Sequence, residues 1–72
     1  MSSITFMYQG MSIDVKCSKG EKLDSIVQRF CQKANVNKDE IMLLYMGRVL
    51  DLEETEDKMG GFGQRMVMVM EK

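Results

Sequence analysis

The residue types that most often carry chemistry are few in this chain, and their spacing does not assemble a catalytic site. The sequence of 72 residues contains no histidine and two cysteines, Cys17 and Cys31. Without an imidazole base, neither a serine nor a cysteine can be activated as a nucleophile in the usual way. Two cysteines without histidine also cannot form a typical zinc site. We interpret both as small thiols at inward-facing positions, with a disulfide as the alternative.

Acidic side chains are concentrated in residues 51–57, and glycines in residues 60–63. The acidic segment shows no sign of a buried carboxylate pair, so it offers no support for acid-base catalysis, and we interpret it as a solvated loop. The glycines lack the Lys-Ser/Thr pair and the strand-to-helix context of a phosphate-binding loop, and we interpret them as a flexible connector. We therefore predict that the protein is not an enzyme and uses no cofactor or metal ion.

The composition indicates one small domain spanning residues 1–72. Hydrophobic residues make up 44% of the chain, charged residues 29%, and the formal net charge is −1. Nothing in this balance favours binding to nucleic acid or to an anionic membrane. The apolar runs are far shorter than the roughly 18 residues of a membrane span. Because the first three residues also lack the features of a signal peptide, we expect a cytoplasmic and/or nuclear protein.

The elements that would position functional residues begin with a predicted β-hairpin. Residues 4–8 and 11–17 are alternating segments on either side of Gln9-Gly10. Two loop residues ending in glycine are typical of a tight hairpin. Because side chains alternate along a strand, this loop places four apolar residues on one face. They form two pairs: Phe6 with Ile13, and Ile4 with Val15.

Residues 23–34 are predicted to form an amphipathic helix of about three to four turns. Lys22 is a poor residue for the N-terminal cap, whereas Asp24 suits the first turn. Asn35 can take the left-handed conformation that ends a helix. The inward face is formed by Leu23, Ile26, Val27, Phe30, Cys31 and Ala34.

Further strands are predicted after the helix. A capped single turn at residues 37–40 leads into a third strand at 41–46, and Gly47 permits a turn into a short fourth strand at 48–50. The last strand covers residues 66–70. The order is a hairpin, a helix and then further strands, and one helix packed on one sheet gives both elements a partner for their apolar faces.

With these elements in place, the chain resembles the ubiquitin-like, or β-grasp, family over residues 4–70. The resemblance is carried by the hairpin, by the helix and by Leu43-Leu44-Tyr45-Met46-Gly47-Arg48-Val49-Leu50, which is similar to Leu-Ile-Phe-Ala-Gly-Lys-Gln-Leu of ubiquitin. Phe30-Cys31-Gln32-Lys33 and the glycine segment 59–63 are similar to the SUMO branch. The resemblance implies an α+β fold of ββαββ order, in which one helix packs across a mixed four- to five-stranded sheet.

The end of the chain departs from the conjugated members of this ubiquitin/SUMO branch. Those modifiers end in a flexible tail with two glycines, whereas this sequence ends Met70-Glu71-Lys72. Gly60-Gly61 lies before a predicted strand and cannot serve as that tail. We therefore expect a domain that is not conjugated, with a modifier truncated before its tail as the alternative.

A set of outward-facing apolar side chains is the feature that rises above this background. In the ubiquitin arrangement the first, last and third strands are adjacent, so their outward residues would form one patch. The resemblance places the recognition surface of the family there: Leu44 and Met70 match its apolar contacts, and Met68 replaces a histidine. The predicted partner-binding residues are Met7, Met42, Leu44, Met46, Met66, Met68 and Met70.

Contiguous exposed apolar surface usually marks a binding site, and methionine adapts to partners of differing shape. We expect protein partners, namely helices or domains of the kind that bind ubiquitin, and a monomer or weak homodimer. A non-catalytic interaction domain in ubiquitin- or proteasome-related processes is the function that this predicts. The alternatives are the truncated modifier and a structural subunit that packs permanently through the methionine-rich face.

A second surface follows from the resemblance to SUMO, which receives an extended peptide as an added strand between its second strand and its helix. Backbone pairing would provide affinity there, and basic residues would attract acidic flanks. A SUMO-interacting type of peptide is the partner that this groove would take. Its predicted residues are Met11, Ile13, Lys16, Lys19 and Arg29.

Overall fold

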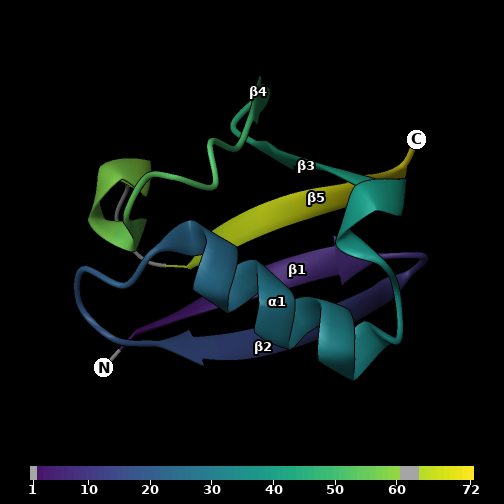
Figure 1. Cartoon of the computed structure of the whole chain (residues 1–72), viewed down its shortest axis with the longest axis horizontal. Coiled ribbons are helices and arrows are strands. Elements are labelled where there is room, and N and C mark those ends of the chain that lie inside the picture. Colours follow the sequence, from purple (N-terminus) through teal and green to yellow (C-terminus); the bar gives the residue numbers. More distant parts are fainter. Residues whose placement is uncertain (1, 61–63) are drawn as a thin grey trace.

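A computed structural model describes residues 2–60 and 64–72 and shows a hairpin followed by a helix and three more strands. Figure 1 shows the single long helix crossing one face of the sheet. In the described part of the chain, no helix has the length and apolarity needed to cross a membrane. The elements are β1 (Ser2–Tyr8), β2 (Met11–Cys17), α1 (Leu23–Ala34), η1 (Lys38–Glu40), β3 (Ile41–Tyr45), β4 (Arg48–Val49), η2 (Glu56–Met59) and β5 (Arg65–Glu71).

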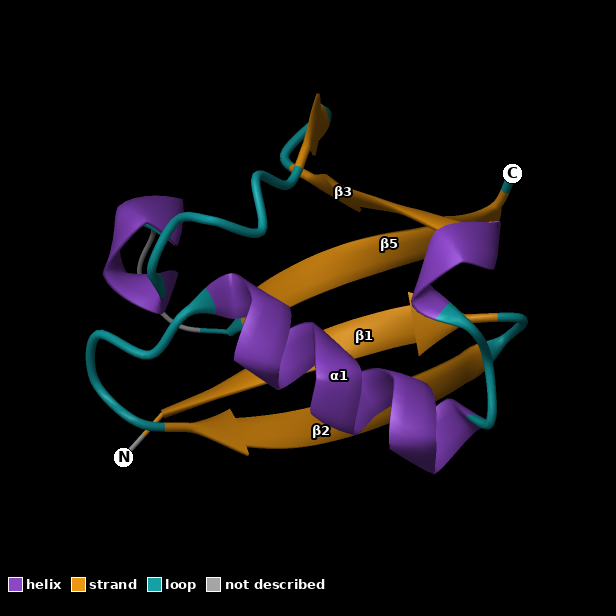
Figure 2. Cartoon of the chain, in the orientation of Figure 1, coloured by secondary structure: helices purple, strands orange, loops and turns teal. Residues whose placement is uncertain are grey.

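The five strands form one mixed sheet in the order β2-β1-β5-β3-β4. The first and last strands, β1 and β5, pair in parallel at its centre, and the other neighbours are antiparallel. Figure 2 shows α1 on one side of this sheet, with loops and short turns at its ends. The predicted α+β arrangement, one helix across a mixed β-grasp sheet, is therefore confirmed.

The β1–β2 hairpin has the predicted register, with Phe6 opposite Ile13 and Ile4 opposite Val15. Its two loop residues both have positive φ, 49° at Gln9 and 78° at Gly10. This is the turn geometry that matches the natural twist of the two strands. Three of the four paired side chains are fully buried under the helix, and Ile13 is half-buried.

The core lies between α1 and the inner face of the sheet. The Phe6 ring stacks on the Phe30 ring of the helix at 4.5 Å between centroids, and the Tyr8 ring meets the edge of Phe30 at 6.0 Å. The helix has the predicted bounds, and Asn35 ends it in the left-handed conformation with φ 57°. The left-handed conformation was predicted from the sequence, and the Asn35 N–H donates to the carbonyl of Cys31.

Both cysteines are buried free thiols, which confirms their interpretation as small core residues. Cys17 is the last residue of β2, and Cys31 lies on the inner face of α1. Burial raises the pKa of the Cys31 thiol because the thiolate loses its solvation.

Several predicted strand ends are wrong: β1 begins at Ser2 rather than at residue 4, and β5 covers Arg65–Glu71 rather than 66–70. The third strand ends at Tyr45, and Met46 and Gly47 form a two-residue turn with φ 51° and 81°. The strand stops there because Tyr45 pairs directly with Arg48, which leaves two residues to reverse the chain. The fourth strand ends at Val49, although the Leu50 N–H still donates to the Leu43 carbonyl at 2.9 Å. Of the predicted glycine connector, residues 61–63 lie outside the described residues.

The acidic segment 51–57 also needs a correction. Most of its carboxylates are exposed, as predicted, but Glu56 begins the short helix η2 and is only 5% exposed. Its carboxylate forms an ion pair with Arg65 at 2.8 Å and accepts the Gly20 N–H at 2.8 Å. Arg65 also donates to the hydroxyl of Ser2 at 2.9 Å. The carboxylate therefore joins the loop before α1 to the start of β5, a contact between residues far apart in the sequence.

We expect Glu56→Gln to lower the free energy of unfolding by about 1–3 kcal/mol, because the Arg65 guanidinium loses its charged partner in a site with little solvent. Urea denaturation of the two proteins at neutral pH measures this difference. Glu53→Gln is the matched control: Glu53 is exposed in the same loop, and its substitution should change stability by less than about 0.5 kcal/mol. Equal effects of the two substitutions would contradict a structural role for the buried pair.

The same pair predicts a pH dependence. The Gly20 N–H and the Arg65 guanidinium hold the pKa of Glu56 below its ordinary value. A lowered folded-state pKa gives a stabilisation that is complete above the pKa of the unfolded carboxyl, about 4.3, and that is lost as pH falls through the folded-state pKa. The stability difference between the wild type and Glu56→Gln should therefore shrink below about pH 4 in the same denaturation experiment.

Candidate protein-interaction face

The sheet register brings outward-facing apolar side chains from four strands into one row. Met7 of β1 lies opposite Met68 of β5, Met68 lies opposite Leu44 of β3, and Leu44 lies opposite Val49 of β4. A second pair, Met42 with Met70, lies beside this row. We call this surface the methionine face and define it as Met7, Met42, Leu44, Val49, Met66, Met68 and Met70.

The alternation along β5 explains why this face exists. Val67 and Val69 point into the core and are 0% and 7% exposed. The residues between and beside them point the other way, and Met66, Met68 and Met70 are 45%, 53% and 49% exposed. One side of β5 packs into the core, and the helix covers only that side. The other side is left to solvent, and its residues are apolar and uncharged.

The other predicted members of this surface are less exposed or differently placed. Met7, Met42 and Leu44 are half-buried because neighbouring strands flank each of them. Met46 was predicted to follow the alternation of β3, but it lies in the β3–β4 turn and is 78% exposed. Its strand position is therefore wrong, and its part in partner binding stays a prediction. Val49 was missed because the sequence does not show that β4 pairs with β3 in this register.

A polar border separates the methionine face from the outer edge of the sheet. Thr5, beside Met66, is buried although it points to the outer side. Its hydroxyl donates to Asp14 on β2 at 2.7 Å and accepts from Gln64 at 2.9 Å. Ser12 of β2 donates to the sulfur of Met7 at 3.2 Å. An apolar centre with a polar border is the usual composition of a protein-protein interface.

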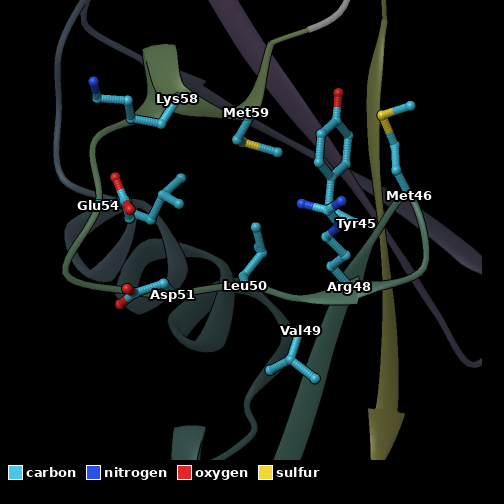
Figure 3. A pocket seen from close by; sticks show the side chains of 10 residues that line it. Tyr45, Met46, Arg48, Val49, Leu50, Asp51, Glu54, Lys58 and Met59 are labelled. Atoms are coloured by element: carbon cyan, nitrogen blue, oxygen red, sulfur yellow. The ribbon is translucent and has the colours of Figure 1, made fainter.

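A hollow of about 390 Å³ lies next to this face, between the β3–β4 turn and the η2 turn. In Figure 3, Tyr45 and Met59 point toward the hollow from opposite elements, while Val49 points away from it. The Tyr45 hydroxyl donates to the Gly60 carbonyl at 3.2 Å and so joins the two elements. The lining residues are Leu23, Tyr45, Met46, Arg48, Val49, Leu50, Asp51, Glu54, Lys58 and Met59. No sequence signal marked it, because its two walls come together only in the fold.

The charged residues that line the hollow are two acids, Asp51 and Glu54, and two bases, Arg48 and Lys58. Among residues 2–60 and 64–72, no group of three or more cysteine or acidic side chains is placed to hold a metal ion.

The second predicted surface lies where the sequence placed it, along the free edge of β2. Two backbone carbonyls of this edge already accept hydrogen bonds from side chains of α1. The Arg29 guanidinium donates to the Lys16 carbonyl at 2.7 Å and forms an ion pair with Glu21 at 2.5 Å. The Lys33 ammonium donates to the Asp14 carbonyl at 3.0 Å. An added peptide strand would have to displace both side chains from the carbonyls that it needs.

The other residues predicted for this groove do not gather around one point. Met11 lies beside the hairpin turn opposite Tyr8 and is 51% exposed. Ile13 points toward the helix and is half-buried. Lys19 lies in the loop that follows β2 and is exposed. The structure therefore brings together Lys16 and Arg29 but leaves Met11 and Lys19 at opposite ends of the strand.

We compared the sequence and the structure with those of known proteins. No family model and no curated protein matches the chain. Among solved structures, a chain from a crystal structure of ATBAG1 in complex with HSP70 has a TM-score of 0.87 at 12% identity, over 100% of this chain and 41% of that one. The solution NMR structure of the ubiquitin-like domain of Arabidopsis thaliana protein At2g32350 has a TM-score of 0.82 at 18% identity, over 97% of this chain and 76% of that one.

These similarities establish the fold, which is the ubiquitin-like β-grasp. The chain spans 41% of the length of the ATBAG1 chain. The neighbours contain ubiquitin-like domains, and the fold predicted from the order and spacing of the elements is confirmed.

The two sides of β5 should respond differently to substitution. We expect Met68→Glu to change the free energy of unfolding by less than about 1 kcal/mol, because the side chain is half exposed on an outward position. Val67→Ala should cost about 2 kcal/mol or more, because it leaves a cavity in the core. Thermal and urea unfolding of the two variants measure this contrast. Comparable losses of stability would show that the methionine side of β5 is structural.

Proposed function

We propose that this chain is a non-catalytic ubiquitin-like interaction domain that binds a partner protein through the methionine face. The observation that carries the proposal is the row Met7, Met68, Leu44 and Val49, which crosses four strands without a charged residue. The sheet register itself produces this row. An uncharged row of apolar side chains is suited to recognition by apolar contact.

The physical case rests on the cost of leaving this surface in water. Each buried square ångström of apolar surface contributes about 25 cal/mol, and half-exposed methionines at 66, 68 and 70 give up that contribution in the isolated chain. Contiguous apolar surface of this kind marks an interaction site on a soluble domain. Methionine is unbranched and polarizable, so the face can adapt to the side chains of its partner.

The partner that fits best presents an apolar stripe of its own, as an amphipathic helix or a small helical domain of the ubiquitin-binding type does. The ubiquitin-like fold supports this class of partner. A chain with a similar fold, ATBAG1, is found in complex with the protein HSP70, which supports protein partners in general. Ubiquitin- or proteasome-related processes are the setting that we propose for the interaction.

The geometry favours the methionine face over the β2 edge. Strand addition at β2 requires free carbonyls, and those of Asp14 and Lys16 are bound by Lys33 and Arg29. The methionine face requires no such displacement at β5, because Met66, Met68 and Met70 are already exposed. Binding at this face is therefore opposed by fewer interactions within the chain.

A nuclear magnetic resonance titration tests the proposal. The probe is a synthetic ubiquitin-interacting-motif helix added to the ¹⁵N-labelled chain. We expect the largest chemical-shift changes at Leu44, Met68 and Met70 and small changes at Asp14 and Lys16. Changes confined to β2 would overturn the assignment of the face, and no change with a panel of ubiquitin-binding helices and domains would overturn the class of partner.

A matched pair of variants tests the same site by affinity. Met68→Glu should weaken binding of the probe helix at least tenfold, because a carboxylate would be buried without a partner. Met11→Glu is the control: Met11 is 51% exposed, close to the 53% of Met68, but lies at the hairpin end away from the face. Its affinity should stay within about twofold of the wild type. Equal losses in the two variants would contradict the proposal.

Self-association through the same face is checked in the same experiments. Sedimentation of the wild type and Met68→Glu at several concentrations separates the two cases. A monomer that binds the helix supports the proposal. A dimer that Met68→Glu dissociates, with no helix binding, would replace it with self-recognition.

A further inference from the structure

We infer that the methionine face is also a modification site, at which a peroxide oxidises the exposed thioethers and thereby closes the face to apolar partners. The inference rests on the proposed function for what the face binds, but the modification itself is argued from the placement of the methionines. The protein contains nine methionines in 72 residues. Their distribution between surface and core is what gives oxidation a defined effect.

No methionine of the described residues is buried in the core, although Met59 is partly buried and packs against it. The fourteen buried hydrophobic residues that form the core include none among the described residues. On β5 the separation is complete between Arg65 and Glu71, where both inward side chains are valine and all three outward ones are methionine. Oxidation of β5 therefore changes only its outward side, because the inward valines contain no sulfur that peroxide could oxidise.

The reaction needs an oxidant but no catalytic group from this chain. The thioether sulfur attacks one oxygen of hydrogen peroxide, the O–O bond breaks, and a sulfur–oxygen bond forms. Sulfur loses two electrons, and the second peroxide oxygen leaves as water after proton transfer. The product is methionine sulfoxide, which is polar where the thioether was apolar. Sulfoxide reductases reverse the step at the expense of two thiols, which are oxidised to a disulfide as water is released.

Met68 is the residue at which oxidation has the largest effect. It lies at the centre of the row, between Met7 and Leu44, and is 53% exposed. A sulfoxide oxygen is a strong hydrogen-bond acceptor, and neither neighbour offers a donor. A partner that covers it with apolar surface would bury this acceptor unsatisfied, which weakens binding by roughly tenfold to a hundredfold.

The two thiols do not compete strongly for the oxidant. Peroxide reacts with the thiolate, and Cys17 and Cys31 are 3% and 9% exposed. Burial also raises the pKa of the Cys31 thiol and keeps it protonated. Met7 is half-buried and its sulfur accepts a hydrogen bond from Ser12 at 3.2 Å, so it should react more slowly than its exposed neighbours.

The first experiment measures where the oxygen goes. The full chain is treated with hydrogen peroxide and followed by peptide mapping in a mass spectrometer, with circular dichroism on the same samples. We expect Met11, Met46, Met66, Met68 and Met70 to oxidise several-fold faster than Met7, Met42 and Met59, with the fold retained. The inference would be overturned if all these residues oxidised at the same rate, or if the protein unfolded as soon as the first methionines were oxidised.

The second experiment measures what oxidation does. Retention on a hydrophobic-interaction column and binding of the probe helix are compared before and after peroxide, and again after treatment with sulfoxide reductases and a dithiol. We expect both to fall on oxidation, the helix affinity by at least tenfold, and to return on reduction. An oxidised protein that is retained and binds as the reduced one does would overturn the inference.

Two variants make the effect specific. A triple variant carrying Met66→Leu, Met68→Leu and Met70→Leu keeps apolar side chains on β5 and both cysteines but has no thioether there. Compared with the same variant before treatment, its column retention and helix affinity should fall less in peroxide than those of the wild type do. Met11→Leu removes an equally exposed methionine elsewhere and should give no protection. A peroxide-induced fall in the triple variant as large as in the wild type would overturn the inference.

Failure of the proposed function is distinguishable from failure of this inference. If the reduced protein does not bind the helix, the proposed function is overturned. The site-selective oxidation and the change in column retention then still support or refute the modification site by themselves.

Discussion

The parallel pairing of β1 with β5 is the constraint on which the rest of this structure depends. These strands come from opposite ends of the described chain and pair within the sheet, where β2 pairs with β1, β3 pairs with β5, and β4 pairs with β3. One register determines both sides of the sheet: Phe6 beside Val67 on the inner face, and Met7 beside Met68 on the outer face. A slip of one residue in β5 would turn methionines into the core and valines into solvent, so the core and the interaction face are stabilised by the same pairing.

The ion pair between Glu56 and Arg65 acts at the point where this register begins. Arg65 is the first residue of β5 and lies opposite Ile4 of β1. Its guanidinium is held by the Glu56 carboxylate and by Ser2 at the start of β1. These contacts position the first residue of the last strand against the first strand. A polar cluster at one end of the sheet thus supports an apolar surface at its centre, although the two share no side chain.

The outer edge of the sheet and its outer face differ in chemistry because their strands differ in backbone pairing. An edge strand exposes unpaired backbone groups, and β2 covers two of its carbonyls with Arg29 and Lys33 from the helix. The central strands β1 and β5 each pair with a strand on both sides, so recognition at their outer face depends on side chains. Those side chains are thioethers and branched alkyl groups, which bind by contact and, in the case of methionine, change polarity on oxidation.

The sequence by itself determined the elements whose information is local. The hairpin followed from Gln9-Gly10 between alternating segments, the helix followed from its apolar spacing, and the inward and outward sides of β5 followed from strict alternation. The tertiary structure alone decided where those elements meet: that β4 adds Val49 to the face, that Met46 adopts a positive φ and leaves the strand, that Glu56 is buried against Arg65, and that Tyr45 and Met59 enclose a hollow. The physical reason is the range of the interactions involved, since side-chain alternation acts between neighbours in the sequence, whereas pairing of the two chain ends brings together residues with no local relation.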